Sequence, residues 1–356
     1  MHTVARRKRG RPVAALAAAV AVTLAACDAA GGGDYSVADA LARVPAMDVE
    51  GLWITTADLD TATTVAGLER PTEPGEVPQW ILALTAEADS PAFVPLPEIL
   101  AQTSPVEESA DSFGWSILDV DAFAGGDAAP TDHFATLVGD FDDETLADLP
   151  VVEDGIVTVG EGEDFATDLD AATEANPLGV PQRLAESDGE IAVSPSTPLV
   201  REWLAGPESS LADDEVLAVL ADVLDSADVY SAAFYRGDYS LSADALPPGA
   251  EPEVLIREPF ETVGMGWASD DDGPLMVVAY AFEDSDSAGA AAEEVRGVWS
   301  DGVSLVNAAP WSERVSVEDV VTHGSIVEAR LRPVEQAPLS LPMRALQARD
   351  LPFQHG

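Results

Sequence analysis

The chain has 356 residues, of which 47% are hydrophobic, and a formal net charge of −48. This hydrophobic content is typical of a chain that folds around a core, so disorder throughout is excluded. A strongly negative protein repels phosphate backbones and anionic headgroups, which excludes nucleic acids and anionic membrane surfaces as expected partners.

The first 26 residues have the three-part layout of a secretory signal peptide. A basic cluster comes first, then an apolar run over residues 12–26 that ends in small residues. This run has about fifteen residues, whereas a membrane-spanning helix needs about 20. We therefore expect residues 1–26 to be a cleaved leader and not a permanent membrane span.

The leader ends in Leu24-Ala25-Ala26-Cys27. These residues resemble the lipobox of bacterial lipoproteins, in which the cysteine becomes the lipidated first residue of the mature chain. The resemblance covers the leader alone. It implies acylation of Cys27 and attachment to the outer face of a membrane, because an acyl chain supplies the apolar area that holds a domain to a bilayer. The alternative is ordinary cleavage with an unmodified cysteine at the next position.

Cys27 is the only cysteine, so its acylation leaves no thiol for disulfides, metal binding or catalysis. Five of the 17 basic residues lie in the leader and all 65 acids lie outside it, so the mature chain is lysine-free with a charge of about −53. This composition resembles that of proteins from salt-adapted, high-GC bacteria such as actinobacteria. A cation-binding surface is the alternative explanation.

The chain downstream of the leader alternates short predicted strands and helices, which predicts an α+β fold with antiparallel sheets and helices packed on one face. A glycine-rich segment precedes the folded part and is typical of a flexible tether. The predicted parts are a leader at 1–26, lipid attachment and tether at 27–35, α+β subdomains at 36–225 and 226–340, and a C-terminal tail at 341–356.

Periodicity and turn residues predict the elements in chain order. Residues 90–112 are rich in proline and acids and are expected to be mostly irregular. Asp188-Gly189 is expected to be the two-residue turn of a hairpin. The predicted helices are 36–44, 61–68, 80–88, one that follows the acidic residues 140–144 and runs through 149, 198–204, 211–224 and 288–299. The predicted strands are 51–56, 133–138, 155–159, 183–187, 190–193, 229–235, 264–269, 275–282 and 326–331.

Three histidines follow the leader, at His133, His323 and His355. His133 follows Asp132 and His323 lies near Ser325, so either is a candidate general base. A histidine at a strand edge is more often a surface or capping residue, which is the interpretation we favour. The sequence contains no nucleophile elbow, phosphate loop, dinucleotide fingerprint or paired-histidine zinc motif, so no catalytic residue is assigned.

Two acidic segments are candidate metal sites, although no cofactor is expected. Residues 284–289 begin like a calcium loop, but Ala288 and Val295 occupy its fifth and twelfth positions, where ligands are needed. We interpret the segment as a turn in which Asp286 or the next serine caps a helix. Residues 270–273 are interpreted as a hairpin loop. The residues that would give weak Ca²⁺ binding are Asp270, Asp271, Asp272, Asp284 and Asp286.

The chain has seven tryptophans, and an exposed indole ring can stack on a sugar or fill a partner's pocket. Those within apolar predicted elements are expected in the core; they are Trp53, Trp267 and Trp299. Those near predicted loops are candidate ligand-binding residues; they are Trp115, Trp203 and Trp311.

The sequence therefore favours a non-catalytic lipoprotein that binds or scaffolds a component of the cell envelope. Its expected partners are a membrane, through the lipid on Cys27, and an envelope protein, with no nucleic acid. A solute-binding lipoprotein of a transporter is an alternative that predicts two lobes with mostly parallel sheets. A hydrolase is a second alternative, which predicts two buried carboxylates about 5 to 9 Å apart in a cleft.

Overall fold

The computed structural model describes residues 35–356, apart from residues 48, 50, 86–89, 104, 129–131, 143, 242–253 and 335–336. The predicted leader, Cys27 and the predicted tether up to residue 34 lie outside the described residues. Residues 35–356 form one compact unit. None of the described helices is long and apolar enough to span a bilayer.

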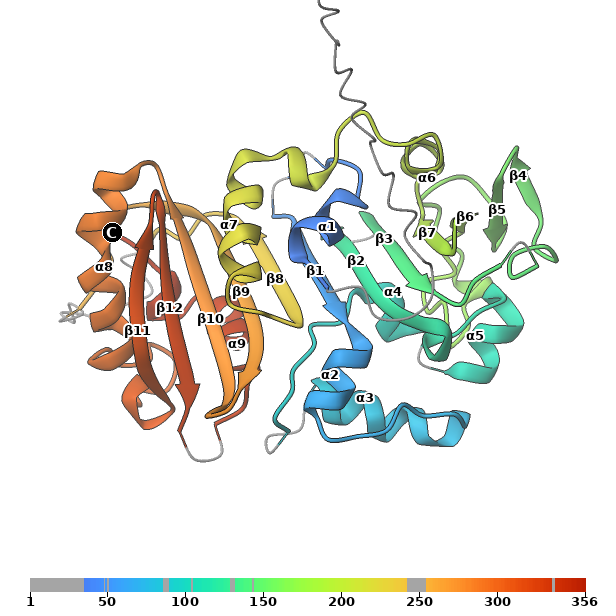
Figure 1. Ribbon diagram of the computed structural model, residues 1–356. Coiled ribbons are helices and arrows are strands. Elements are labelled where there is room, and N and C mark those ends of the chain that lie inside the picture. The colour runs from blue at the N-terminus through green and yellow to red at the C-terminus, as the bar shows by residue number, and fades with distance from the viewer. Residues whose placement is uncertain are drawn as a thin grey trace, which may run out of the picture. The chain divides into compact units, whose positions relative to one another are not determined.

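The described strands form one sheet in the order β11-β12-β10-β9-β8-β1-β2-β3-β7-β6-β5-β4 (Figure 1). Neighbouring strands in this order pair antiparallel, which confirms the predicted α+β class with an antiparallel sheet. The strands are β1 (Trp53–Asp58), β2 (Val120–Ala128), β3 (Asp132–Gly139), β4 (Val151–Glu153), β5 (Ile156–Val159), β6 (Gln182–Ser187), β7 (Glu190–Ser194), β8 (Ser231–Arg236), β9 (Phe260–Asp270), β10 (Gly273–Phe282), β11 (Val315–His323) and β12 (Ile326–Pro333).

Helices cover two faces of the sheet, where the sequence pattern predicts one, because the central strands are apolar on both sides. The α7 face, at the front in Figure 1, packs against α1 (Val37–Ala42), α6 (Thr197–Leu204) and α7 (Glu215–Asp225). The opposite α9 face packs against α2 (Leu59–Val65), α3 (Val77–Thr85), α4 (Glu98–Gln102), α5 (Val106–Phe113), α8 (Ser285–Ser300) and α9 (Leu341–Gln347).

Several sequence predictions are confirmed, and others are wrong. The helix predicted to run through residue 149 is wrong, because residues 144–148 form turns. Asp188 and Gly189 both have positive φ and turn the β6–β7 hairpin as expected. Residues 90–112 are more ordered than predicted, because α4 and most of α5 lie there and bury apolar side chains. Residues 341–356, predicted to be a C-terminal tail, also bury apolar side chains. They form α9 and a 3-10 turn whose Phe353 is fully buried.

The sheet consists of two halves with the same strand order. Read outward from the centre, one half runs β1-β2-β3-β7-β6 and the other runs β8-β9-β10-β12-β11, with β4 and β5 added at the outer edge of the first. In each half the first three strands lie side by side in chain order. The final two strands of the half follow in reverse order, so β7 pairs with β3 and β12 pairs with β10. The predicted boundary at 225/226 falls between the halves, but the sheet crosses it through the β1–β8 pair. The two predicted subdomains are therefore halves of one unit.

Because β1 and β8 are antiparallel, an approximate two-fold axis passes between them. Two glycines support this relationship, one on each second strand. A Cβ on Gly126 would lie 3.2 Å from Leu52, which precedes β1, and a Cβ on Gly266 would lie 2.6 Å from Val229, which precedes β8. Each half thus has a glycine where the segment leading into its first strand crosses its second strand.

Helices α1 and α7 pack against each other across the central strand pair, in opposite directions. The carboxylate of Asp225, at the end of α7, accepts hydrogen bonds from the Ser36 hydroxyl at 2.9 Å and from the backbone N–H groups of Val37 and Ala38. At the other end of α1, the Leu211 N–H donates to the Val44 carbonyl at 2.9 Å. Asp225 thus satisfies donors at the start of α1 that have no partner within the helix.

Replacing Asp225 with alanine removes these three acceptor contacts, so we expect Asp225→Ala to lower the free energy of unfolding by about 1–2 kcal/mol. Urea denaturation followed by circular dichroism measures this change. The control is Asp222→Ala, an exposed aspartate one turn earlier on α7, which should change it by less than about 0.5 kcal/mol. Equal effects of the two substitutions would contradict the role assigned to Asp225.

Candidate functional site

The burial of the tryptophan side chains differs from the sequence prediction. Trp115 and Trp311 are 1% and 2% exposed, so neither can offer its ring to a ligand, and that prediction is wrong for both. Their flanking segments look like loops, but the indoles fill the core beneath them. Trp203 is half-buried on α6, where it packs against the core of the α7 face. Trp53, expected in the core, is half-buried and lines an open hollow.

The predicted acidic metal sites are not assembled. Asp270 pairs with Arg332 at 2.5 Å in the β9–β10 hairpin, and Asp271 and Asp272 are exposed in its turn. Asp284 is the N-cap of α8, accepting from the Asp286 and Ser287 N–H groups. The cap is therefore Asp284, not Asp286 or the next serine, because its carboxylate reaches the free N–H groups of the first turn. Among the described residues no three His, Cys, Asp or Glu side chains could hold a metal ion.

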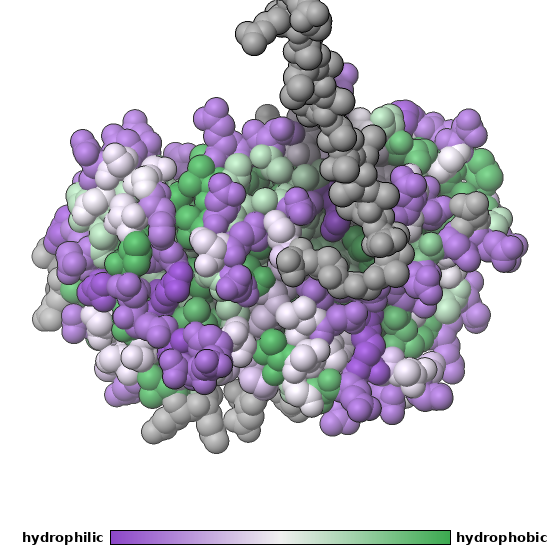
Figure 2. Space-filling model, viewed as in Figure 1, coloured by the Kyte–Doolittle hydropathy of each residue, from purple (hydrophilic) through white to green (hydrophobic). Residues whose placement is uncertain are grey.

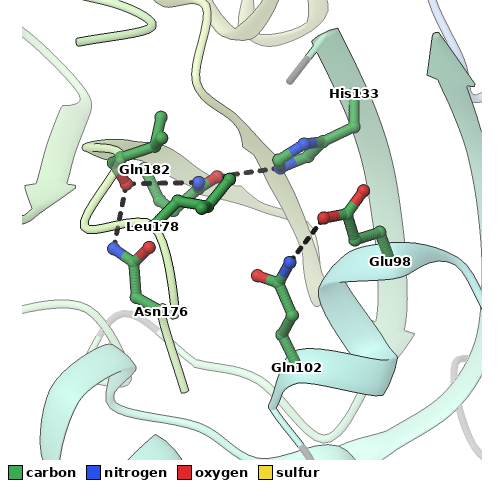
Figure 3. Close-up of a pocket in the computed structure, with 7 residues that line it drawn as sticks. Glu98, Gln102, His133, Asn176, Leu178 and Gln182 are labelled. Atoms are coloured by element: carbon green, nitrogen blue, oxygen red, sulfur yellow. Dashed lines mark hydrogen bonds between the residues drawn. The ribbon is translucent and has the colours of Figure 1, made fainter. Parts of the chain in front are cut away.

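Two of the three histidines have side-chain partners that sequence proximity does not predict. His323 Nε2 lies 2.7 Å from the buried carboxylate of Glu328, which also accepts from Arg330 Nε at 2.6 Å. His133 is buried, and its Nε2 lies 3.0 Å from Gln182 Oε1 (Figure 3). The His323 contact does not involve Ser325, its neighbour in the sequence.

The pocket beside His133 is small and polar. Figure 3 shows Glu98 and Gln102 of α4 facing Asn176 and Gln182 across it. Its volume is about 10 Å³, the space of one water molecule. A pocket of this size does not admit a sugar or an acyl group, so these residues do not make a hydrolase cleft.

His355, in the predicted C-terminal tail, is held by backbone hydrogen bonds. Its N–H donates to the Tyr239 carbonyl at 3.0 Å, and its carbonyl accepts from Leu241 at 2.8 Å. Burial lowers the pKa of its imidazole, although Asp238 and Glu261 nearby act in the opposite direction.

The pairing of the central strands places four side chains in one row on the α9 face. Tyr235 of β8 lies opposite Trp53 of β1, Trp53 lies opposite Asp127 of β2, and Asp127 lies opposite His133 of β3. Residues directly opposite in antiparallel strands point to the same face of a sheet. Burial raises the pKa of the Asp127 carboxyl to about 6, and the negative charge of Glu98 adds to this effect. The row joins the small polar pocket to a larger hollow.

That larger hollow, which we call the seam cleft, lies over the β1–β8 pair. Its first part has a volume of about 570 Å³ and includes Trp53 and Tyr235, whose rings are 5.5 Å apart. Gly237 lies close beneath this pair, because a Cβ at this position would lie 2.5 Å from the Tyr235 ring. The opposite wall comes from the C-terminal segment, through Gln347 and Arg349. A volume of this size is that of a small-molecule site.

The second part of the seam cleft, of about 360 Å³, lies between the helices of the two halves. It shares Gln347 with the first part and is lined mostly by apolar side chains. They are Ile81, Phe93, Val94, Pro95, Leu96, Ala101 and Met343, with Thr85, Ser340 and Arg344 completing the lining.

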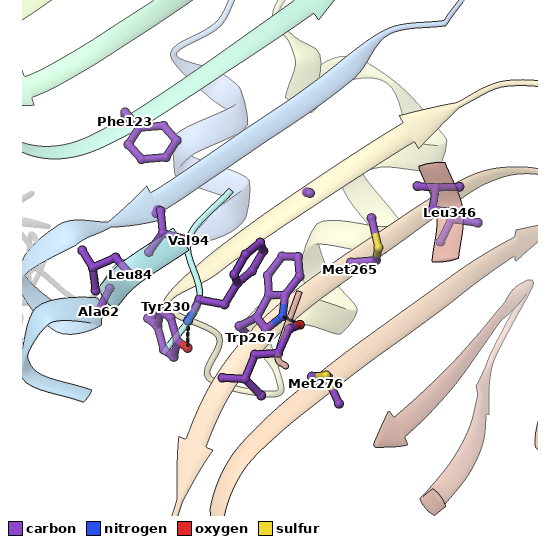
Figure 4. Close-up of a cluster of buried hydrophobic side chains, with 14 of the residues drawn as sticks. Ala62, Leu84, Val94, Phe123, Tyr230, Met265, Trp267, Met276 and Leu346 are labelled. Atoms are coloured by element: carbon purple, nitrogen blue, oxygen red, sulfur yellow. Dashed lines mark hydrogen bonds between the residues drawn. The ribbon is translucent and has the colours of Figure 1, made fainter. Parts of the chain in front are cut away.

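The other end of the β1–β8 pair is closed by the segment around Phe93. The Phe93 N–H donates to the Tyr230 hydroxyl at 3.1 Å, its carbonyl accepts from the Ser231 hydroxyl at 2.8 Å, and its ring lies 4.8 Å from that of Trp267. Figure 4 shows Val94, Tyr230 and Trp267 gathered on this face of the central strands. The two ends of the central pair thus differ: one is filled and the other is open.

Sequence reasoning missed this site. Trp53 and Tyr235 are far apart in the chain, and Arg349 lies in the segment predicted to be a loose tail. The signal in the sequence is the aromatic content of the predicted strand at 51–56, which by itself favours a core position for Trp53.

No family model and no curated protein matches the chain. A solved structure of TP0453, in crystal form III, is similar at a TM-score of 0.36 and 8% sequence identity, over 86% of this chain and 98% of that one. A similarity at this level assigns neither fold nor function.

We expect Asp127→Asn to stabilise the protein at pH 7 by roughly 1–3 kcal/mol. The folded state raises the pKa of Asp127 to about 6, so it binds the proton more tightly than the unfolded chain does. Ionisation therefore costs stability as pH rises from about 4 to about 6, and asparagine avoids that cost. The gain should vanish below about pH 4 in urea titrations across this range. A gain that does not change with pH, or an equal one in the exposed control Asp111→Asn, would contradict the assignment.

Proposed function

We propose that this protein is a lipid-anchored, extracytoplasmic binding protein of the cell envelope, tethered through Cys27, and that the seam cleft is its ligand site. The observation that carries the proposal is the open aromatic pair of Trp53 and Tyr235 at the centre of the sheet. Large aromatic side chains that are half-buried in a concave site are typical ligand contacts, because they offer apolar area at low entropic cost.

The place of the cleft in the fold supports a binding role. Each half contributes one side of it: α3 and α4 come from the first half, and α9 comes from the second. Ligand sites occur preferentially where two such units meet, because neither unit's packing fills the space between them. The lipobox adds the expected location, outside the membrane.

The two alternatives fit the geometry less well. A solute-binding protein of the kind considered above has two lobes with mostly parallel sheets, whereas this chain folds into one antiparallel sheet. The neighbouring carboxylates of Asp127 and Glu98 adjoin a pocket that holds about one water molecule, which leaves no space for a glycosidic substrate.

The binding site is tested by purifying the lipidated protein from its own membranes and identifying by mass spectrometry what copurifies with it. We expect Trp53→Ala to reduce the recovery of the bound component by about tenfold or more, since it removes the largest ring of the cleft. The matched control is Trp203→Ala, half-buried on α6 outside the cleft, which should retain the component. Unchanged recovery with Trp53→Ala, in a variant with wild-type circular dichroism, would count against the seam cleft.

The anchor is tested separately. We expect Cys27→Ala to move the protein from the membrane fraction to the soluble fraction and to remove the mass of the acyl groups from its N-terminal peptide. Gly33→Ala, in the predicted tether, should leave the protein membrane-bound. A Cys27→Ala protein that stays in the membrane fraction would show that another feature holds it there.

A further inference from the structure

We propose that the seam cleft binds a small amphiphilic anion, with a carboxylate or phosphate headgroup at Arg344 and Arg349 and an apolar body against the aromatic and aliphatic lining. This inference rests on the proposed function for the location of the site and adds the chemical class of the ligand.

The first argument is the distribution of ion pairs. Twelve arginines follow the leader, and all lie in the described part of the chain. Nine of them pair with an aspartate or glutamate, as expected in a chain with 65 acids. The arginines without a carboxylate partner among the described residues are Arg314, Arg344 and Arg349. Two of these three line the seam cleft, one in each part.

The acids are correspondingly sparse in the cleft. Asp238 is the one acid among the described residues that line its first part, and none lines the second. The N–H of Ser240 binds the Asp238 carboxylate and lowers its pKa, with a smaller contribution from Arg349. Asp127, opposite Trp53 on β2, is not among the lining residues. Among the described residues, the charged ones that line the cleft are therefore Arg344, Arg349 and Asp238, a net charge of +1 on a molecule whose overall charge repels anions.

The second argument is the backbone at Arg349. It follows the last turn of α9 with φ of +51°, and the next residue's N–H reaches back to the Ala345 carbonyl at 2.9 Å. This helix-ending position favours glycine, because a Cβ in the left-handed region costs about 1 kcal/mol. The Arg349 guanidinium donates to the Asp238 carbonyl at 2.9 Å at the edge of the first part. Strain of this kind that persists beside a cavity points to a role for the side chain.

The third argument is the arrangement of polar and apolar side chains on the walls of the cleft. Ser340, Met343, Arg344 and Gln347 recur at helical spacing and form the side of α9 that faces the second part of the cleft. Leu341 and Ala345 are buried, and Leu346 lines the first part. One side of a short helix thus offers an apolar contact and a guanidinium together. The opposite wall of the second part is apolar, from α3 and the segment around Phe93. A small inorganic anion would make no contact with this apolar wall, and a neutral apolar molecule would make no ion pair with the two arginines.

Isothermal titration calorimetry tests the ligand class, on the chain carrying Cys27→Ala purified without detergent. The probes are dodecanoate, dodecyl phosphate, dodecyltrimethylammonium and inorganic phosphate, each below its micelle concentration in about 0.15 M salt. We expect both anionic amphiphiles to bind at one site, at least about tenfold more tightly than the cationic one. Inorganic phosphate should bind at least about tenfold more weakly than dodecyl phosphate. Non-specific attraction to a chain of this charge would give the opposite order, with the cation bound more tightly.

Variants separate the site from the general charge. We expect Arg344→Ala and Arg349→Gly each to weaken binding of dodecanoate by about fivefold or more. Arg349→Gly should leave the thermal midpoint unchanged or raise it, because glycine relieves the left-handed strain. Arg314→Ala, the third arginine without a carboxylate partner, is the matched control and should bind like the parent chain.

The outcomes distinguish the two proposals. Equal binding of the anionic and cationic probes, abolished by Trp53→Ala, would overturn the anion inference and leave the cleft as the ligand site. If none of the four probes binds, but a component copurifies with the parent chain and is lost with Trp53→Ala, the amphiphilic anion is rejected and the cleft remains the ligand site. Anion binding that survives Trp53→Ala and both arginine substitutions would place the site elsewhere and reject both.

Discussion

The antiparallel pairing of β1 with β8 is the constraint on which the rest of the structure depends. These are the first strands of the two halves, and their pairing converts two shorter sheets into one while removing an exposed strand edge from each. It brings α1 against α7 on one face and sets Trp53 opposite Tyr235 on the other. Without this pair neither the helix contact nor the seam cleft would exist.

The two halves share a strand order, but different helices and segments pack on their α9 faces. The cleft results from that difference. On the α9 face, helices inserted between the first and second strands cover the first half, whereas the second half is covered by α8 and by the C-terminal segment. The segment around Phe93 fills one end of the central pair. No equivalent segment among the described residues fills the other end, so Trp53 and Tyr235 stay accessible. A symmetric sheet with asymmetric covering thus leaves an open hollow over its axis.

Features that depend on neighbouring residues could be predicted from the sequence, and those that depend on distant ones could not. The Asp188-Gly189 hairpin and α7 were predictable, because turn chemistry and helical periodicity are local. The two-fold repeat was not, because the halves share topology and close-approach glycines while their other residues differ. Trp115 and Trp311 were misjudged because nearby loops are a poor guide to burial. Arg349 was missed since its place depends on contacts with Asp238.

The β1–β8 pair also governs how the chain reaches its folded state. β1 is made early and β8 much later, so the inner edge of the first half stays unpaired until most of the polypeptide has been synthesised. Contacts of such long sequence separation slow folding and leave a partly folded species that can associate through its open strand. A formal net charge of −48 opposes that association, since like-charged chains repel one another before their edges can meet. The acidity thus protects the chain during folding as well as after it.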